Sequence, residues 1–220
     1  MNLKWILLGV TCLGLLLSTV SGQGQGGVIT GQVVDNNGAP LPSAQVTASE
    51  IGNRPGGIIP LAETDAKGHF ELQHLKWATY RLYAAKPEAG YPNLRFAFYT
   101  RNQPTAPTVT LTRGSPLATV TLLVGPKAGV IKGVITDAAT GDPVNATIRL
   151  ERSDAPTLWY ARSVQSEYRV LVPATVGISI EVTAEGYRKW VPSREPDAPT
   201  RAPISLKSGQ ELRLDIKLQR

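Results

Sequence analysis

The sequence is poor in the residues that most hydrolytic and metal sites require. Its 220 residues include one cysteine, Cys12, and two histidines, His69 and His74. A single thiol cannot form an internal disulfide, and it offers no set of thiolate ligands for zinc. Two histidines leave few bases for a serine triad, and no G-x-S-x-G motif is present. These shortages argue against an enzyme, so we predict a non-catalytic protein.

The remaining polar candidates also favour structural roles. On a strand His69 and Glu71 would share a face, whereas His74 would lie on the other face or in a turn, and three converging metal ligands are not available locally. The acids Asp35 and Asp65 are candidates for paired carboxylates, but Asp is favoured in turns for backbone capping alone. We therefore predict no metal site and no cofactor.

Clustered positive charge is missing as well. The formal net charge is +6, but basic residues are scattered singly and alternate with acidic ones. Nothing resembles the basic patch of a nucleic-acid-binding protein, so nucleic acid is excluded as an expected partner.

Only one long apolar run is present, and it lies at the N-terminus. It extends from Trp5 to Leu17 after the basic Lys4, and small residues follow up to Gly22. This layout predicts a secretory signal peptide over residues 1–22, cut near Gln23. The run is short for a permanent span, which needs about 20 apolar residues. We expect a secreted, periplasmic or cell-surface protein without a permanent membrane span; an uncleaved anchor is the alternative.

An internal repeat occupies the rest of the chain. The segment from Val28 to Val46 matches the segment from Val130 to Ile148, and the order of later matches is preserved. Each copy is about a domain long, which indicates a tandem duplication over residues 27–125 and 128–220. The join between them, residues 125–129, is short, so limited freedom between the two domains is expected.

Each copy shows the pattern of β-strands. Apolar residues alternate with polar ones over residues 212–219, and no long helical stripe occurs in the mature chain. Gly38 and Gly141 lie in turns between predicted strands, where a residue without a Cβ is favoured. With 17 prolines and 21 glycines punctuating short strands, the sequence predicts an all-β protein of two tandem antiparallel, Ig-like β-sandwiches.

The same residues carry a family resemblance. The pattern G-x-V-x-D-x-x-G-x-P from Gly31, with the later run from Thr64 to Phe70 and the pair Gly90-Tyr91, resembles the carboxypeptidase regulatory-like domain. The resemblance implies a transthyretin-like sandwich, grouped with carbohydrate-binding-like folds. It covers about residues 27–125 and is weaker in the second copy. It implies no peptidase activity, because the zinc motif of metallocarboxypeptidases belongs to a separate catalytic domain.

Two tyrosines have a predicted structural role. Tyr91 and Tyr187 each follow a glycine in matching places of the two copies. As in related sandwiches, each ring is expected at a corner with its hydroxyl bonded to nearby backbone.

Aromatic residues supply the functional hint. Alternation over residues 94–99 predicts a strand with Tyr99 on its exposed face, and Trp190 is expected to face outward by the same parity. Trp159 and Tyr160 are adjacent, so one of them must face away from the core if that segment is extended. Exposed rings of this kind can stack on sugars. The candidate glycan-stacking residues are therefore Trp190, Trp159, Tyr160 and Tyr99.

Three function classes follow from these observations. The first is an exported non-catalytic module for structural support or for protein or surface interaction. The second is a carbohydrate-binding protein, and the third, least favoured, is a hydrolase accessory to a peptidase or glycosidase. The expected partners are cell-surface proteins or polysaccharide, and the sequence leaves the oligomeric state open.

Overall fold

The structure is a computed structural model that describes residues 26–52, 59–100, 106–192 and 203–220. The predicted signal peptide, residues 1–22, lies outside the described residues. No helix in the described part of the chain is long and apolar enough to cross a membrane.

The first sandwich consists of two sheets built from the first half of the chain. One sheet has the order β4-β1-β7 and the other the order β3-β2-β5-β6. The strands are β1 (Gly27–Val34), β2 (Gln45–Glu50), β3 (Leu61–Glu63), β4 (His69–Leu75), β5 (Thr79–Ala85), β6 (Thr108–Thr110) and β7 (Leu117–Leu123).

The second sandwich repeats this strand order, except that its closing strand is divided into β14 and β15. Its sheets have the orders β11-β8-β14, with β15 also on β8, and β10-β9-β12-β13. The strands are β8 (Gly129–Asp137), β9 (Ala146–Arg152), β10 (Ala155–Val164), β11 (Glu167–Val172), β12 (Gly177–Thr183), β13 (Ile204–Ser205), β14 (Glu211–Arg213) and β15 (Ile216–Leu218). The predicted all-β fold of tandem sandwiches is confirmed.

One feature of the sheets differs from the prediction. β7 runs parallel to β1, and β14 and β15 run parallel to β8, whereas the other pairs are antiparallel. The sheets are therefore mixed. The last strand of each copy returns to the first strand after the chain has passed through the opposite sheet, and such a crossover allows a parallel pair.

The predicted turn glycines adopt the expected conformation. Gly38 has φ 79° and Gly141 has φ 78°, in the left-handed region that side chains with a Cβ avoid. Gly31 and Gly133 serve another purpose, because the closing strand passes directly over them. A Cβ at Gly31 would lie 1.9 Å from the carbonyl oxygen of Val120.

Each sandwich has its own apolar core. The alternating inward residues of β1, β2, β4 and β5 form the first cluster, and those of β8, β9, β11 and β12 form most of the second. The second cluster also contains Phe98 and Tyr99, which come from the first half of the chain. Burying an aromatic side chain of this size contributes about 1.5–3 kcal/mol.

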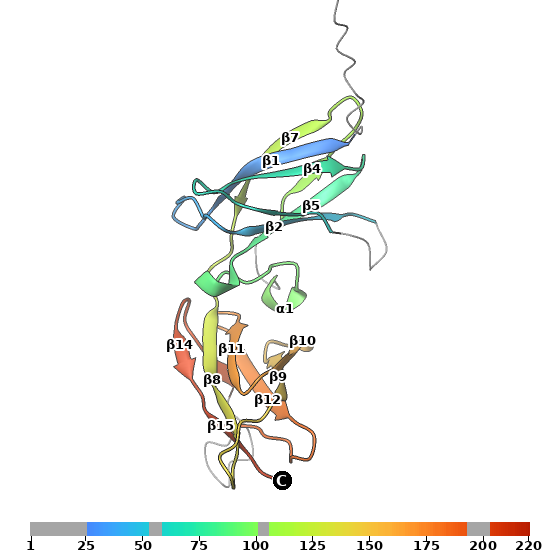
Figure 1. Ribbon diagram of the computed structural model, residues 1–220. Coiled ribbons are helices and arrows are strands. Elements are labelled where there is room, and N and C mark those ends of the chain that lie inside the picture. The colour runs from blue at the N-terminus through green and yellow to red at the C-terminus, as the bar shows by residue number, and fades with distance from the viewer. Residues whose placement is uncertain (1–25, 53–58, 101–105, 193–202) are drawn as a thin grey trace, which may run out of the picture.

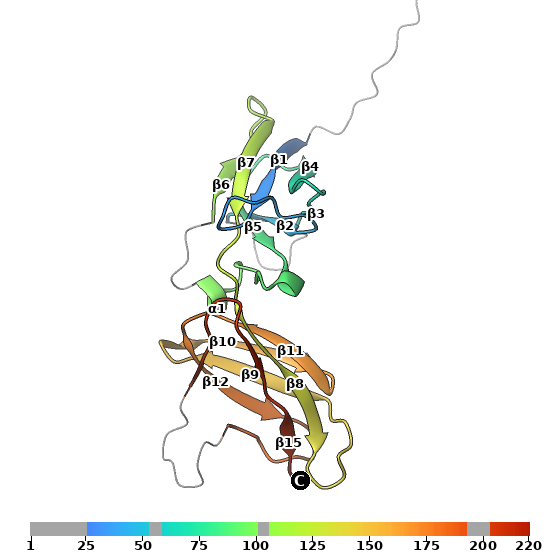
Figure 2. The ribbon, with the colours of Figure 1, turned by 90° about the vertical axis from the view of Figure 1, so that its left-hand side faces the viewer.

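Phe98 and Tyr99 lie on a short helix, not on the strand predicted over residues 94–99. A 3₁₀ turn, η1 (Pro87–Ala89), and the helix α1 (Ala97–Thr100) follow β5. Two successive residues of a strand face opposite ways, whereas one helical turn lets Phe98 and Tyr99 both enter the same core. Figures 1 and 2 show α1 between the two sandwiches, which lie end to end. Residues 87–100 are called the clasp segment below.

Hydrogen bonds tie the clasp segment to the second sandwich. The Tyr99 hydroxyl donates to the carbonyl of Leu171 over 3.2 Å, and Nη1 of Arg152 donates to the carbonyl of Phe98 over 2.8 Å. The connection between sandwiches is held as well, since the amide of Ala128 donates to the carbonyl of Gly90 over 2.8 Å. The short join and these bonds restrict the relative movement of the two sandwiches.

Candidate functional site

Trp159 is the most exposed of the predicted stacking residues. It lies on β10 opposite Glu151 of β9, and its exposed fraction is 52%. The guanidinium carbon of Arg149 lies 4.7 Å from the centre of the Trp159 ring, a cation–π contact. The neighbour, Tyr160, faces the other way and packs against the second core. The parity prediction for this pair, one ring outward and one inward, is confirmed.

A shallow hollow lies on the same sheet as Trp159. It has a volume of about 220 Å³ and extends over β9, β12 and the residues after Trp190. Its lining is Arg149, Glu151, Ile178, Ser179, Ile180, Glu181, Val191 and Pro192. Glu151 pairs with Arg149 at 3.6 Å, and Glu181 pairs with Lys189 at 3.1 Å. The surface therefore offers both signs of charge and hydrogen-bonding groups beside one exposed indole, the kind of lining that can hold a polar ligand.

The other candidate rings do not form an exposed platform. The prediction that Tyr99 faces solvent is wrong, because its exposed fraction is 9% and burial raises the pKa of its hydroxyl well above the usual range. Trp190 is half-buried, forms a two-way backbone pair with Val182 and packs against the second core, so the outward orientation expected for it is also wrong. Parity failed at Trp190 because it stands in an isolated bridge and not in a continuous strand.

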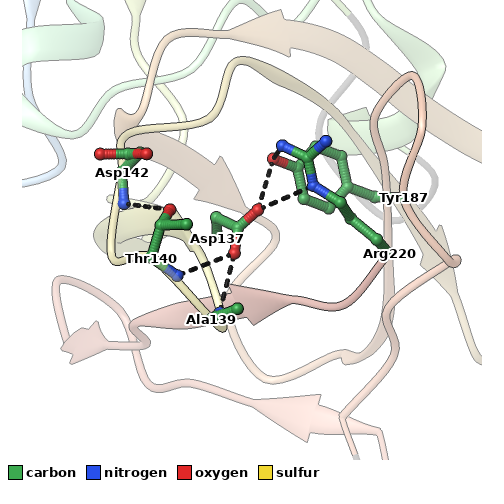
Figure 3. Close-up of polar contacts among 6 residues, drawn as sticks. All are labelled: Asp137, Ala139, Thr140, Asp142, Tyr187 and Arg220. Carbon is green, nitrogen blue, oxygen red and sulfur yellow. Dashed lines mark hydrogen bonds and ion pairs between the residues drawn. The ribbon is translucent and has the colours of Figure 1, made fainter.

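The most connected polar cluster surrounds Asp137 at the end of β8 (Figure 3). One carboxylate oxygen accepts the amides of Ala139 and Thr140, over 2.8 and 3.1 Å. The other accepts the Tyr187 hydroxyl over 3.0 Å and Nε of Arg220 over 3.1 Å. Asp137 is buried, with an exposed fraction of 4%.

This environment keeps Asp137 ionised. The two backbone amides, followed by Arg220 and the Tyr187 hydroxyl, hold the pKa of the carboxyl far below its usual range. A carboxylate with so low a pKa is a poor proton donor or acceptor near neutral pH. The cluster therefore fixes the turn after β8 and holds the side chain of Arg220.

In the first copy the matching aspartate, Asp35, also caps its own turn. Oδ1 of Asp35 accepts the amides of Asn37 and Ala39, over 2.8 and 3.0 Å. The Tyr91 ring is buried, and the pKa of its hydroxyl is raised by burial and by the charge of Asp35. The expected bond from each tyrosine hydroxyl to backbone is corrected: Tyr187 donates to a carboxylate, and within the described residues no backbone group bonds the Tyr91 hydroxyl.

The polar residues of β4 lie as the strand pattern predicts. His69 and Glu71 are both on the exposed face, and His74 has φ 57°, outside regular strand geometry. Oδ1 of Asp65 caps its own turn by accepting the amides of Lys67 and His69, both over 2.8 Å. In the part of the chain that the structure describes, no group of three or more His, Cys, Asp or Glu side chains could hold a metal ion.

Sequence reasoning missed Arg152, whose exposed fraction is only 2%. Its Nε and Nη2 donate to the two carboxylate oxygens of Asp154, both over 2.9 Å, and its Nη1 reaches the clasp segment. The Arg-x-Asp spacing at the β9–β10 turn is a weak signal for the ion pair. Nothing local in the sequence indicates the contact with Phe98, 54 residues away.

Comparison with solved structures yields several distant similarities. The Bacillus anthracis TIE protein aligns with 88% of this chain and 34% of its own (14% identity, TM-score 0.34). A streptococcal ancillary pilin aligns with 88% of this chain and 62% of its own (13%, TM-score 0.34). A DUF3823 family protein from Bacteroides ovatus aligns with 75% of this chain and 94% of its own (11%, TM-score 0.34). This chain thus spans less than two thirds of the first two, and similarity at this level supports no functional conclusion.

The sequence itself matches one family model. No curated protein is significantly similar to the chain. Residues 28–124 match the model of the carboxypeptidase regulatory-like domain, and this range contains every strand of the first sandwich from β2 to β7 and nearly all of β1. The first sandwich is therefore the part of this chain that is similar to the carboxypeptidase regulatory-like domain.

Proposed function

We propose that this protein is an exported, non-catalytic β-sandwich module that gives structural support or mediates contact with cell-surface proteins or polysaccharide. The observation that carries the proposal is the clasp segment. Phe98 and Tyr99 leave the first sandwich and complete the core of the second. A linker that only tethers two independent domains does not contribute side chains to the core of the next domain. A protein that gives structural support must hold its two domains in a fixed orientation, and a shared core does this.

The use of the acidic residues supports a non-catalytic role. Asp35, Asp65 and Asp137 each accept two backbone amides within their own turns. Carboxylates engaged in this way stabilise turns, and a general acid or nucleophile needs free access to a substrate.

Small-angle X-ray scattering tests the supporting role. We expect the purified protein to fit one extended shape, and Phe98→Ala with Tyr99→Ala to broaden the distribution of sizes because the joint is released. Arg95→Ala is the matched control, since Arg95 belongs to the same segment and is exposed. Scattering from the unmodified protein that requires freely reorienting sandwiches contradicts the proposal.

A second function, glycan binding, is favoured by one specific observation. Trp159 exposes half of its surface beside the charged hollow on β9 and β12. Stacking on an aromatic ring contributes about 1–3 kcal/mol per base in nucleic-acid complexes, enough to dominate a weak module. In affinity electrophoresis on a polysaccharide panel, Trp159→Ala is expected to abolish retardation and Trp190→Ala to reduce it less. Retardation that survives Trp159→Ala rejects this site, and no retardation by any glycan leaves the supporting role.

A further inference from the structure

The edges of the four sheets differ in how well they are protected against pairing with another strand. An exposed edge is normally blunted by shortness, by charge or by irregular geometry. Among the described edges β3, β6 and β13 have at most three residues. β4 and β11 carry charged residues, as do β14 and β15, and the register of β10 shifts between Ala155 and Trp159.

β7 has none of these protections. It is seven residues long, from Leu117 to Leu123, and it carries no charged residue. It pairs with β1 in unbroken register and is the last strand of its sheet. The corresponding edge of the second sandwich is split into β14 and β15, and Lys132 beside it forms an ion pair with Glu211. The two copies therefore differ at this edge.

The sequence of β7 is also nearly symmetrical about Val120. Its outward row is Leu117, Thr119, Thr121 and Leu123, all exposed, and its inward row is Ala118, Val120 and Leu122. Leu117 and Leu123 keep exposed fractions of 62% and 55%, although both are large and apolar. When such a strand meets its own copy in the antiparallel sense, like side chains fall opposite each other.

We propose that β7 is a self-association edge, through which two copies of this chain pair antiparallel about a two-fold axis at Val120. In this register Leu117 lies opposite the partner's Leu123, and Thr119 lies opposite the partner's Thr121. Leucine pairs and threonine pairs across antiparallel strands stabilise a sheet, and no like charges are opposed. The contact is isologous and uses the free β7 edge of each copy, so assembly stops at the dimer.

The choice of a second copy over a foreign strand follows from the symmetry. A foreign partner requires only an open edge, and it places no demand on the order of side chains within β7. The matched outward row of Leu, Thr, Thr and Leu has a simple explanation only if β7 meets itself. This proposal goes beyond the supporting role and does not depend on it.

Charge substitutions within β7 test both the edge and the register. The variant Thr119→Lys with Thr121→Lys opposes two pairs of lysines across the axis. The variant Thr119→Lys with Thr121→Glu opposes each lysine with a glutamate. Both lose the hydroxyl contact between Thr30 and Thr119, so they differ only in the charge at position 121. The control, Thr108→Lys with Thr110→Lys, adds the same charge to the exposed positions of the short edge β6.

Sedimentation velocity over about 1 µM to 1 mM measures the dimer, in the range where weak interfaces assemble. We expect concentration-dependent doubling of mass, a loss of about tenfold or more in dimer affinity for the Lys/Lys variant, and recovery to within about threefold for the Lys/Glu variant. The β6 control should match the parent. Thermal unfolding must show each variant folded.

Several outcomes overturn the proposal. These are a monomer at every concentration, a dimer that the Lys/Lys variant leaves intact, and assembly beyond the dimer. A Lys/Glu variant that stays as weak as the Lys/Lys variant rejects the two-fold register. Binding of a foreign strand by a chain that does not pair with itself likewise rejects it.

Discussion

Single residues recur in matching roles in the two copies. Gly31 and Gly133 both lie against a carbonyl of the closing segment, where a Cβ would approach within 1.9 Å of the Val120 oxygen and 2.2 Å of the Leu214 oxygen. Asp35 and Asp137 both accept amides of the turn that follows. These equivalences were visible as sequence matches. Their physical reasons were not, because the closing segment lies about 80 to 90 residues further along the chain.

Substitution of Gly31 tests this close approach. Gly31→Ala forces a Cβ against the Val120 carbonyl, which cannot move without breaking the β1–β7 pair, and should lower the free energy of unfolding by about 3 kcal/mol. A Cβ at Gly38 would meet no atom within 4 Å. Gly38→Ala should therefore lower the free energy of unfolding by only about 1 kcal/mol, the cost of a left-handed φ for alanine. Urea unfolding measures both. Equal losses contradict the steric explanation.

The Asp137 cluster predicts a pH-dependent contribution to stability. The folded-state pKa of Asp137 lies below its ordinary value of 3.8, so the ionised form is favoured by folding. The stabilisation is complete above that value and is lost as the pH falls toward the lower folded pKa. At pH 7 Asp137→Asn should lower the unfolding temperature, and the difference from the parent should shrink below about pH 4.

Arg220→Ala provides the graded control for Asp137. Backbone amides are the larger cause of the pKa shift and Arg220 the smaller, so this variant should lose less stability than Asp137→Asn. A difference between Asp137→Asn and the parent that stays constant from neutral to strongly acidic pH contradicts the linkage.

At the scale of elements, alternation predicted strands well and failed at the clasp segment. Leu212, Leu214, Ile216 and Leu218 face inward as expected, although the strand is interrupted between β14 and β15. Apolar and polar residues alternate equally clearly over residues 94–99, but this segment forms a turn and α1. A local signal was present: Asn93 accepts the amide of Arg95 over 3.0 Å, a capping interaction typical of Asn before a helical turn. The hydrophobic periodicity of the sequence alone does not reveal such a cap.

Removal of the Phe98 side chain tests which sandwich depends on α1. Phe98→Ala leaves a cavity in the second core, so the second sandwich should lose about 3–5 kcal/mol while the first is unchanged. Calorimetry resolves the two transitions, and Trp77 fluorescence, measured in a background in which Trp159 and Trp190 are replaced by Phe, identifies the first. Arg95→Ala, at an exposed position of the same segment, should change either transition little. Destabilisation confined to the first sandwich contradicts the assignment of Phe98 to the second core.

For the whole molecule, the repeat predicted two sandwiches and the structure shows them end to end (Figure 1). The repeat did not predict their joint, since Tyr160 and Leu171, which receive the clasp segment, lie in the other copy. The stacking surface was predicted only in part. Trp159 is exposed, whereas Tyr99 is buried by a contact with a distant segment and Trp190 is half-buried against the second core.

Export is a testable property of the whole chain. A signal peptide over residues 1–22 predicts that protein recovered outside the cytoplasm begins near Gln23, because the basic start, the apolar run and the small residues coincide there. N-terminal sequencing of that protein decides the question. Recovery of chains that begin at Met1 favours the retained anchor.

The clasp segment has a consequence for genetic exchange. The repeat boundary near residue 128 looks like a natural place to cut, copy or recombine the gene. A second copy released there would lack Phe98 and Tyr99 and would leave an opening in its interior. A foreign domain inserted before it would not supply them. The two sandwiches are alike in strand order but are not interchangeable. We therefore expect the two sandwiches to be inherited together, as one unit.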